Sequence, residues 1–473
     1  MVFADLFFLY VFLPLCLLAY CLAKGLDRKN TVLIVFSLIF YAWGEPLYVL
    51  LLLFSAVFNW RIGLLILRHR DKPGAKAAVT LGVVMNIALL LVFKYSGFIV
   101  ENLNLLLLTN IPVPQIKLPI GISFFTFQAL SYIIDCYWET VDVQRSFKKF
   151  LLYLSLFPQL IAGPIVRYSV VEQEISERTT TLEDVSAGAM RAVIGLAKKV
   201  IIANNLYAIV TTFYDGNIAD LSILGNWYTV IIYSLYVYYD FSGYSDIAIG
   251  LGRIFGFHFN ENFDHPFACT SIAEFWQRWH ISLGSFFRDY LLYLPVFGRP
   301  RVYFNLFLVW FCTGMWHGAS WNYIFWGLYF GAFMLFEQRF GKQLLKKWPV
   351  WVRHIYSKIV IVIGFGIFCF EDLGQLGEFF RHISLVSLFR DHAAFADPLT
   401  WSSFVNNMLL IVTAVVCSLP IFPRIKARVL ESRSEGVYAV GRFAAIIGCI
   451  LLLCISSLLL VNNTNNPFLY FRF

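Results

Sequence analysis

The sequence has little charge. Asp, Glu, Lys and Arg make up 14% of its 473 residues, whereas soluble proteins average about 25%. Hydrophobic residues reach 59%, and no polar stretch is long enough to form a separate soluble domain. Apolar runs of about 20 residues, the length that crosses a bilayer as a helix, recur along the chain. The sequence therefore predicts an all-α, polytopic integral membrane protein, with residues 1–473 as a single membrane domain.

Paired cysteine motifs are also lacking. The nine cysteines show no CxxC spacing and lie mostly within apolar runs, which favours buried, reduced thiols over a disulfide framework or a metal site. No phosphate-binding loop or metal-ligand spacing is present. The net charge of +8 comes from basic residues in short loops between apolar runs. Such charges indicate orientation in a membrane and do not argue for binding to nucleic acid.

The basic loops alternate along the chain in a way that sets a topology. Met1–Asp5 lacks the positive region of a signal peptide, and Lys24, Arg28 and Lys29 follow the first apolar run, which places the N-terminus outside and that loop inside. Continued to the basic loop at 424–433, the alternation predicts about 12 crossings with both termini extracytoplasmic. After the first run, the apolar segments are 31–44, 47–67, 77–99, 118–137, 188–213, 224–252, 303–317, 321–337, 352–370, 404–422 and 437–461.

One apolar stretch, 149–167, does not resemble a crossing helix. Pro158 and Pro164 interrupt it, and a proline removes an amide donor and clashes with the preceding helical turn. Broken backbone at membrane depth is tolerated where it is packed in protein or lines a cavity. We therefore expect a re-entrant segment. The alternative, a kinked crossing helix, would invert every later orientation and spoil the charge alternation.

Two carboxylates, Asp240 and Asp246, lie inside the predicted helix 224–252. Charges at membrane depth are costly and usually face protein or water. Six residues apart on a helix, they point about 120° apart and do not form an obvious acid/base pair. Either they form the polar wall of a cavity, or each holds an arginine or backbone amides.

The stretch 271–321 contains two histidines in tryptophan-rich surroundings. A neutral imidazole can be buried, and it can take and return a proton near pH 7. Ser271 and Glu274 have the spacing of a capping box, so we expect one helix from Ser271 through His280, with Trp276 and His280 on the same face. His317 ends the run from Tyr303, about 24 Å above Arg301 if the 16 intervening residues are helical. This predicts His280 near the inner side and His317 in the outer half.

Several motifs together resemble a known family. The chain is similar to the membrane-bound O-acyltransferases, and among them to the bacterial branch typified by the alginate O-acetyltransferase membrane subunit. Gln277 stands where a second basic residue is expected. Residues 118–338 carry the motifs and would form the catalytic core. The matching stretches are Leu118–Phe124, Leu160–Pro164, Tyr239–Gly250, Glu274–Leu283, Arg288–Leu291 and Trp316–Gly318.

The resemblance implies an enzyme of a bacterial inner membrane that acetylates polysaccharide. An acetyl or other acyl group would move from a cytoplasmic thioester, either acetyl-CoA or an acyl carrier protein, to a hydroxyl on an extracytoplasmic protein or polysaccharide. It implies no tightly bound cofactor and no metal. His317 would be the catalytic base and His280 would position or polarise the thioester. We expect the substrate channel to be lined by Trp316, Trp279, Asp240, Asp246 and Arg278.

Other interpretations remain open from the sequence. A nearby one is transfer of D-alanyl or another acyl group from a carrier protein to a cell-wall polymer. A different class is a lipid or solute transporter, which would also suit broken helices and buried carboxylates. His317 could instead be a packing residue, with Gly314 and Gly318 forming a close helix contact. His280 could be an interfacial histidine.

Overall fold

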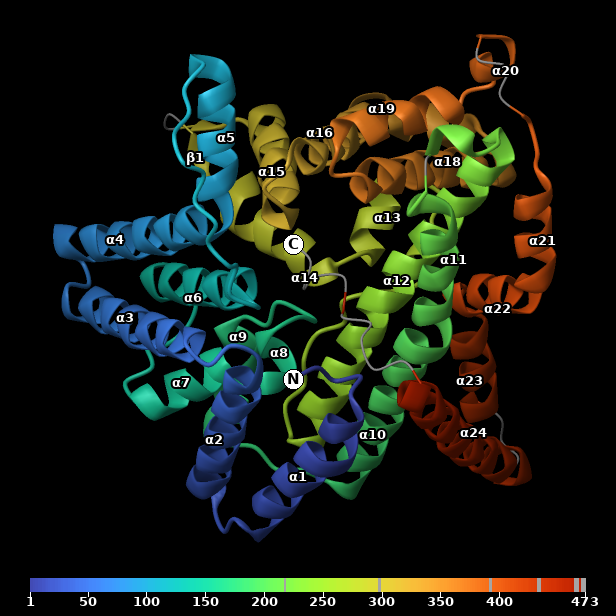
Figure 1. Ribbon diagram of the computed structural model, residues 1–473. Helices are drawn as coiled ribbons and strands as arrows, with labels where there is room; N and C mark the ends of the chain where they lie inside the picture. Colours follow the sequence, from blue (N-terminus) through green and yellow to red (C-terminus); the bar gives the residue numbers. More distant parts are fainter. Residues whose placement is uncertain (217, 297–298, 391–393, 432–434, 463–467, 469–473) are drawn as a thin grey trace. The chain divides into compact units, whose positions relative to one another are not determined.

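The computed structural model describes all residues except 217, 297–298, 391–393, 432–434, 463–467 and 469–473. Over that range its regular secondary structure is helical apart from one short antiparallel pair, β1 (Pro295–Val296) and β2 (Arg299–Pro300), which confirms the all-α class (Figure 1). The chain divides into two compact units. One holds Met1–Gly195 and Tyr244–Glu261 with the end of the chain from Leu460, and the other holds Leu196–Gly243 and Asn262–Leu459.

The first unit is built on long apolar helices. Among them, α3, α4 and α6 pack against one another and lie side by side in Figure 1. The predicted helical runs of this unit are all present. Its elements are η1 (Phe8–Phe12), α1 (Leu13–Leu22), α2 (Leu26–Gly44), α3 (Tyr48–Arg68), α4 (Pro73–Leu90), η2 (Leu91–Tyr95), α5 (Ser96–Leu107), α6 (Ile122–Tyr137), α7 (Phe147–Ser155), α8 (Phe157–Leu160), α9 (Tyr168–Ser176) and α10 (Leu182–Ala197).

The segment 149–167 is broken, as its prolines predict. Helix α7 ends before Leu156, α8 restarts with Pro158 in its first turn, and residues 161–167 are not helical. The break is buried inside the unit: the Phe157 amide donates to Ser37 Oγ at 3.0 Å, and the Phe157 ring packs 5.5 Å from that of Phe40. The segment is therefore broken, and its irregular backbone is packed in protein as expected. The re-entrant course stays a prediction, because a break is common to it and to the kinked crossing helix.

The second unit contains both histidine segments. Helix α12 begins in this unit and continues past Gly243 into residues of the first. Its elements are η3 (Lys198–Ala203), α11 (Asn204–Tyr214), η4 (Ile218–Asp220), α12 (Ile223–Ile254), η5 (Pro266–Ala268), α13 (Ile272–Arg278), α14 (Ile281–Phe287), η6 (Arg288–Leu292), α15 (Val302–His317), α16 (Trp321–Phe336), η7 (Glu337–Gly341), α17 (Lys342–Leu344), η8 (Leu345–Lys347), α18 (Val350–Cys369), α19 (Leu373–His382), α20 (Val386–Arg390), α21 (Pro398–Asn406), α22 (Met408–Ser418), α23 (Ile421–Glu431) and α24 (Glu435–Asn462).

Within the described residues, five helical stretches are long and apolar enough to cross a membrane: Tyr48–Arg68, Pro73–Leu107, Leu182–Tyr214, Val350–Cys369 and Gly436–Val461. A sixth is counted if α21 and α22, bent by 65°, form one span. The multi-pass membrane class is thus supported, but the predicted count of about 12 is not confirmed. Several predicted crossings, such as α6, α15 and α16, have only 16 residues, about 24 Å of helix against a hydrocarbon core of about 30 Å.

Candidate active site

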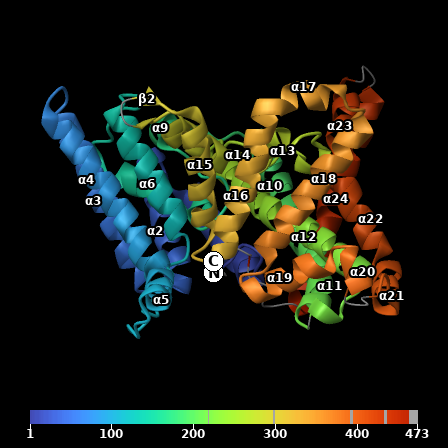
Figure 2. The same ribbon diagram turned by 90° about the horizontal axis from the view of Figure 1, so that it is seen from above.

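His317 is placed by a close helix crossing. Helices α15 and α16 run side by side (Figures 1 and 2). A Cβ added to Gly314 would lie 2.4 Å from the Tyr323 carbonyl oxygen, and one added to Gly327 would lie 2.3 Å from the Trp310 carbonyl oxygen. Only glycine allows backbones to approach so closely. The crossing therefore fixes the end of α15, where His317 is the last helical residue.

The imidazole of His317 lies among aromatic rings. Its centroid is 4.9 Å from that of Trp316, 4.7 Å from that of Trp326 on α16, and 5.2 Å from that of Phe368 on α18. The side chain is buried, with 5% of its surface exposed. The glycine contact that we set against a catalytic role is real, since Gly314 packs on α16. This contact brings the imidazole of His317 against the indole of Trp326 and leaves it in the interior of the protein.

His280 is placed differently from the prediction. Helix α13 ends at Arg278 and α14 begins at Ile281, so His280 does not lie on one helix with Trp276, and the shared face predicted for them is wrong. The His280 backbone adopts a left-handed conformation, with φ 44° and ψ 53°, which is rare for a residue other than glycine. A right-handed helix needs negative φ and ψ, so the helix is interrupted at this residue. The helical periodicity used for the prediction fails at this residue.

A loop from another part of the chain holds this break. The Ile281 amide donates to the Asn262 carbonyl at 3.0 Å, and the Asp264 amide donates to the Arg278 carbonyl at 2.9 Å. The Asn262 side-chain oxygen accepts from the Ser282 amide and hydroxyl and contacts His280 Nδ1 at 3.2 Å. Burial lowers the pKa of His280 to about 3, because the charged form loses its hydration. The imidazole is therefore neutral at physiological pH.

One indole contacts both histidines. The Trp316 ring centroid lies 5.5 Å from that of His280 and 4.9 Å from that of His317. The two imidazoles are 37 residues apart in the sequence, yet they touch the same side chain. The structure thus brings together His280, Trp316 and His317, three of the residues predicted to form the site.

Two other predicted channel residues support the loop around His280. The Trp279 ring packs 5.4 Å from Phe275 and 5.1 Å from Phe365, so its indole joins the aromatic core. Arg278 pairs with Glu274 at 2.9 Å across one helical turn and contacts the Asp264 carbonyl at 3.4 Å. Both residues hold the break from the α13 side.

The two predicted carboxylates form ion pairs. Asp240 pairs with Lys199 at 2.5 Å, and both side chains are almost completely buried. Asp246 pairs with Arg191 at 2.7 Å within the first unit. For Asp246 the structure therefore shows one of the two predicted alternatives, an ion pair with an arginine. Asp240 lies next to Phe241, whose ring meets that of His280 at 4.6 Å.

The capping box is present in a modified form. Ser271 Oγ accepts from the Glu274 amide at 3.0 Å, but the Glu274 carboxylate accepts from the Thr270 amide at 2.7 Å. The buried carboxylate of Glu337, which directly follows α16, accepts from two further first-turn amides, those of Ile272 and Ala273, at 2.7 and 2.8 Å. These bonds satisfy donors that a helix start leaves unpaired.

Sequence reasoning missed Asn262, Lys199, Trp326 and Glu337. Asn262, Lys199 and Glu337 act through partners 18 to 65 positions away in the chain, and Trp326 contacts His317 from the next helix, so no local spacing points to them. The indirect signal for Lys199 was a buried carboxylate that required a cation. For Glu337 it was a helix start whose amides needed acceptors.

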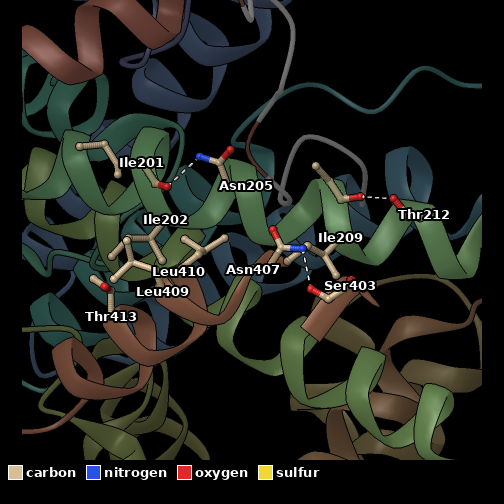
Figure 3. A pocket seen from close by; sticks show the side chains of 11 residues that line it. Ile201, Ile202, Asn205, Ile209, Thr212, Ser403, Asn407, Leu409, Leu410 and Thr413 are labelled. Carbon is tan, nitrogen blue, oxygen red and sulfur yellow. Dashed lines mark hydrogen bonds between the residues drawn. The ribbon is translucent and has the colours of Figure 1, made fainter. Parts of the chain in front are cut away.

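A cavity of about 650 Å³ lies elsewhere in the second unit, between η3–α11 and the bent pair α21–α22 (Figure 3). Its two asparagines bond to the preceding turn, since the Asn205 amide donates to the Ile201 carbonyl and the Asn407 amide to the Ser403 carbonyl. The Ser403 hydroxyl bonds to that of Tyr228 on α12. None of the predicted site residues lines it. Its lining is Ile201, Ile202, Asn205, Ala208, Ile209, Thr212, Ser403, Asn407, Leu409, Leu410 and Thr413.

Metal-ligating side chains do not gather at the histidines. Across the part of the chain that the structure describes, no three His, Cys, Asp or Glu residues are grouped in a way that could hold a metal ion. Fold and site together define a helical, multi-pass membrane protein in which two buried imidazoles share one indole.

Comparison with known proteins gives the class of reaction. Residues 139–371, which include both histidines, match the membrane-bound O-acyltransferase family, and the chain belongs to this family. The probable alginate O-acetylase AlgI of Azotobacter vinelandii is 38% identical over 79% of this chain and 76% of that protein. The peptidoglycan O-acetyltransferase of Helicobacter pylori is 34% identical over 68% of each chain. The teichoic acid D-alanyltransferase of Bacillus subtilis is 32% identical over 56% of this chain and 70% of that protein.

The protein is therefore an O-acyltransferase of a membrane family, as the motifs predicted. The transporter interpretation is not supported, because the family and its relatives are named for acyl transfer.

Proposed function

We propose that the protein moves an acetyl group from a cytoplasmic thioester to a hydroxyl on the extracytoplasmic side, for O-acetylation of a bacterial polysaccharide. The observation that carries this proposal is the pair of buried imidazoles on Trp316 in a chain similar to an alginate O-acetylase over most of its length. A thioester is already activated, so transfer needs a base, a group that polarises the carbonyl, and exclusion of water.

His317 acts as the base in this proposal. Its imidazole accepts the proton of the acceptor hydroxyl, whose oxygen attacks the thioester carbonyl carbon. The carbon–sulfur bond then breaks, and the thiol leaves with the proton that the imidazolium returns. The aromatic rings around His317 would keep water from competing with the hydroxyl.

The other predicted residues support this centre. His280 positions the thioester, and Trp316 forms the wall between the two imidazoles. Trp279, Arg278 and Asp240 would line the channel in this proposal, held by the packing and ion pairs around them. The channel role predicted for Asp246, which pairs with Arg191 within the first unit, stays a prediction.

The proposed orientation follows from the charge alternation of the loops. Both termini are extracytoplasmic in an inner membrane, the segment 149–167 enters and leaves from the cytoplasmic side, and His317 lies in the outer half. The acyl donor and the acceptor can then meet inside the protein without the donor crossing the membrane. The acyl group would pass to an extracytoplasmic partner protein or directly to the polymer.

The test is mass spectrometry of the acylated product after purified protein receives acetyl-CoA and candidate acceptors. General-base help is typically worth about 10² to 10⁴ in rate, so we expect His317→Ala to lower turnover by that factor. A matched control is His382→Ala, since His382 is also a buried histidine of the second unit and pairs only with Glu378 among the ion pairs found for it. Equal activity of the two variants would refute the role of His317.

A second candidate keeps the reaction and changes the donor. The similarity to a teichoic acid D-alanyltransferase favours transfer of D-alanyl or another acyl group from a carrier protein to a cell-wall polymer. Supplying the acyl group on coenzyme A and, separately, on a carrier protein distinguishes the two, because only the accepted donor gives labelled product.

A further inference from the structure

The side chain of Asn262 determines which nitrogen of His280 carries hydrogen. Asn262 Oδ1 lies 2.8 Å from the Ser282 hydroxyl and 3.3 Å from the Ser282 amide, and both of these groups donate to it. An atom that accepts from an N–H is the amide oxygen and has no hydrogen to give. His280 Nδ1 lies 3.2 Å from this same oxygen and 3.4 Å from the Ser282 hydroxyl. Because the hydroxyl gives its one hydrogen to Asn262 Oδ1, neither neighbour donates to Nδ1, and Nδ1 is the donor to Asn262 Oδ1.

The other ring nitrogen of His280 is then a bare acceptor. A neutral imidazole carries one hydrogen, and with it on Nδ1 the Nε2 atom presents a lone pair. That atom is buried and meets no hydrogen-bond donor among the described residues. Burying a polar atom without a partner is unfavourable, and such atoms in folded proteins call for an explanation. Trp316, whose ring centroid lies 5.5 Å from that of His280, also contacts His317.

We propose that His280 Nε2 is a hydrogen-bond-accepting subsite that binds an N–H or O–H group of a substrate beside His317, and that Asn262 is the positioning residue that keeps Nε2 free of hydrogen. This rests on the proposed transfer from a thioester to a hydroxyl. Two groups have the right chemistry: an amide N–H of the pantetheine arm of the thioester, and the acceptor hydroxyl. Nε2 accepts a hydrogen bond from its ligand, and the proton stays on the ligand.

The first experiment measures the tautomer. Full-length protein labelled with ¹⁵N-histidine in lipid nanodiscs gives distinct ¹⁵N shifts for protonated and bare ring nitrogens, and the His280 signals are found by their absence in His280→Gln. We expect hydrogen on Nδ1 at pH 7.5, and a shift of the signal toward the other tautomer in Asn262→Leu but not in Asn262→Asp, which keeps an acceptor. Hydrogen on Nε2 in the unaltered protein would overturn the proposal.

The second experiment compares two variants that differ in which nitrogen they imitate. His280→Gln can place its amide oxygen near Nε2, whereas His280→Asn reaches only the position of Nδ1. Asparagine tolerates the left-handed backbone of residue 280 better than glutamine, so strain alone would favour the asparagine variant. We expect the reverse: a KM at least about tenfold higher in His280→Asn than in His280→Gln, with similar thermal stability.

The substrate whose KM rises identifies the ligand. A rise for the thioester assigns the pantetheine amide, and a rise for the acceptor assigns the hydroxyl. Equal KM values in the two variants for both substrates would mean that only water occupies the subsite and would overturn the proposal. If the unaltered protein transferred no acyl group from any thioester, the proposed function would fail. The subsite would still be supported by a ¹⁵N spectrum that shows hydrogen on Nδ1 and by a change in the Nε2 chemical shift when acetyl-CoA alone is added.

Discussion

The two histidine segments of the second unit are held by different forces. His317 ends a regular helix, and its position follows from glycine contacts and from aromatic rings around it. His280 interrupts a helix, and hydrogen bonds from Asn262 and Asp264 hold it there. A sterically placed residue can be predicted from helical periodicity. A residue placed by bonds from a distant loop cannot, because those bonds override the local pattern.

The difference also predicts which substitutions each segment tolerates. Close packing loses stability when volume is added, while a buried polar network loses it when one partner is removed. Each kind of support can therefore be removed separately by substitution.

The largest loss of stability is expected from a substitution that leaves a buried charge without its ion-pair partner. Asp240 pairs with Lys199 in the interior and precedes Phe241, which contacts His280. Asp240→Leu should lower the free energy of unfolding by about 3–5 kcal/mol, since it leaves Lys199 buried without its carboxylate. The double variant Lys199→Met/Asp240→Leu should recover most of that loss. Thermal unfolding in detergent measures both, and a stable single variant would show that this pair does not support the His280 segment.

Glu337 tests whether the two segments are coupled. It follows α16, which packs on the helix of His317, and it accepts amides at the start of α13, which leads to His280. Glu337→Gln should cost about 1.5–3 kcal/mol, because the bonds from the two amides and from the Tyr356 hydroxyl are then no longer accepted by a carboxylate. Glu378→Gln is the control, as Glu378 is a half-exposed surface carboxylate. Equal melting temperatures of the two variants would argue against the coupling.

Gly327 tests the steric support of His317. Gly327→Ala forces a Cβ toward the Trp310 carbonyl oxygen, and we expect a loss of about 1–3 kcal/mol. Gly377→Ala on α19 meets open space and should instead be neutral or stabilising by up to about 1 kcal/mol, because alanine favours the helix. A melting curve for each variant suffices. If both glycines accept alanine equally well, the close crossing is not what places His317.

The smallest change in stability is expected when the pH is lowered. Burial holds the pKa of folded His280 near 3, below the value of about 6.5 expected in the unfolded chain. The unfolded state therefore binds the proton first, so this contribution to stability is complete above pH 6.5 and is lost as pH falls toward 3. Melting temperatures between pH 7.5 and 5.5 sample the upper edge of that window. They should fall less in His280→Gln than in the unaltered protein, and the exposed-site variant His258→Gln serves as control.

Much of the helical framework was predictable from the sequence. The runs 303–317 and 321–337 are the helices α15 and α16 with nearly the predicted ends, because apolar segments bounded by loops have few other structures in a membrane. The break in 149–167 was predictable for a similar reason, since proline cannot continue a helix. The number of spans was not, because helices buried against other helices can be shorter than the bilayer core.

By itself, the sequence determined that the chain is helical, that it belongs in a membrane, and that His280 and His317 stand in motifs of an acyltransferase family. These features depend on composition and on residues adjacent in the chain. The tertiary structure decided that both imidazoles contact Trp316, that Lys199 neutralises Asp240, and that Asn262 sets the conformation at His280. The contacts of His280 with Asn262 and Trp316 and that of Lys199 with Asp240 join residues 18 to 41 positions apart, and no local spacing encodes them.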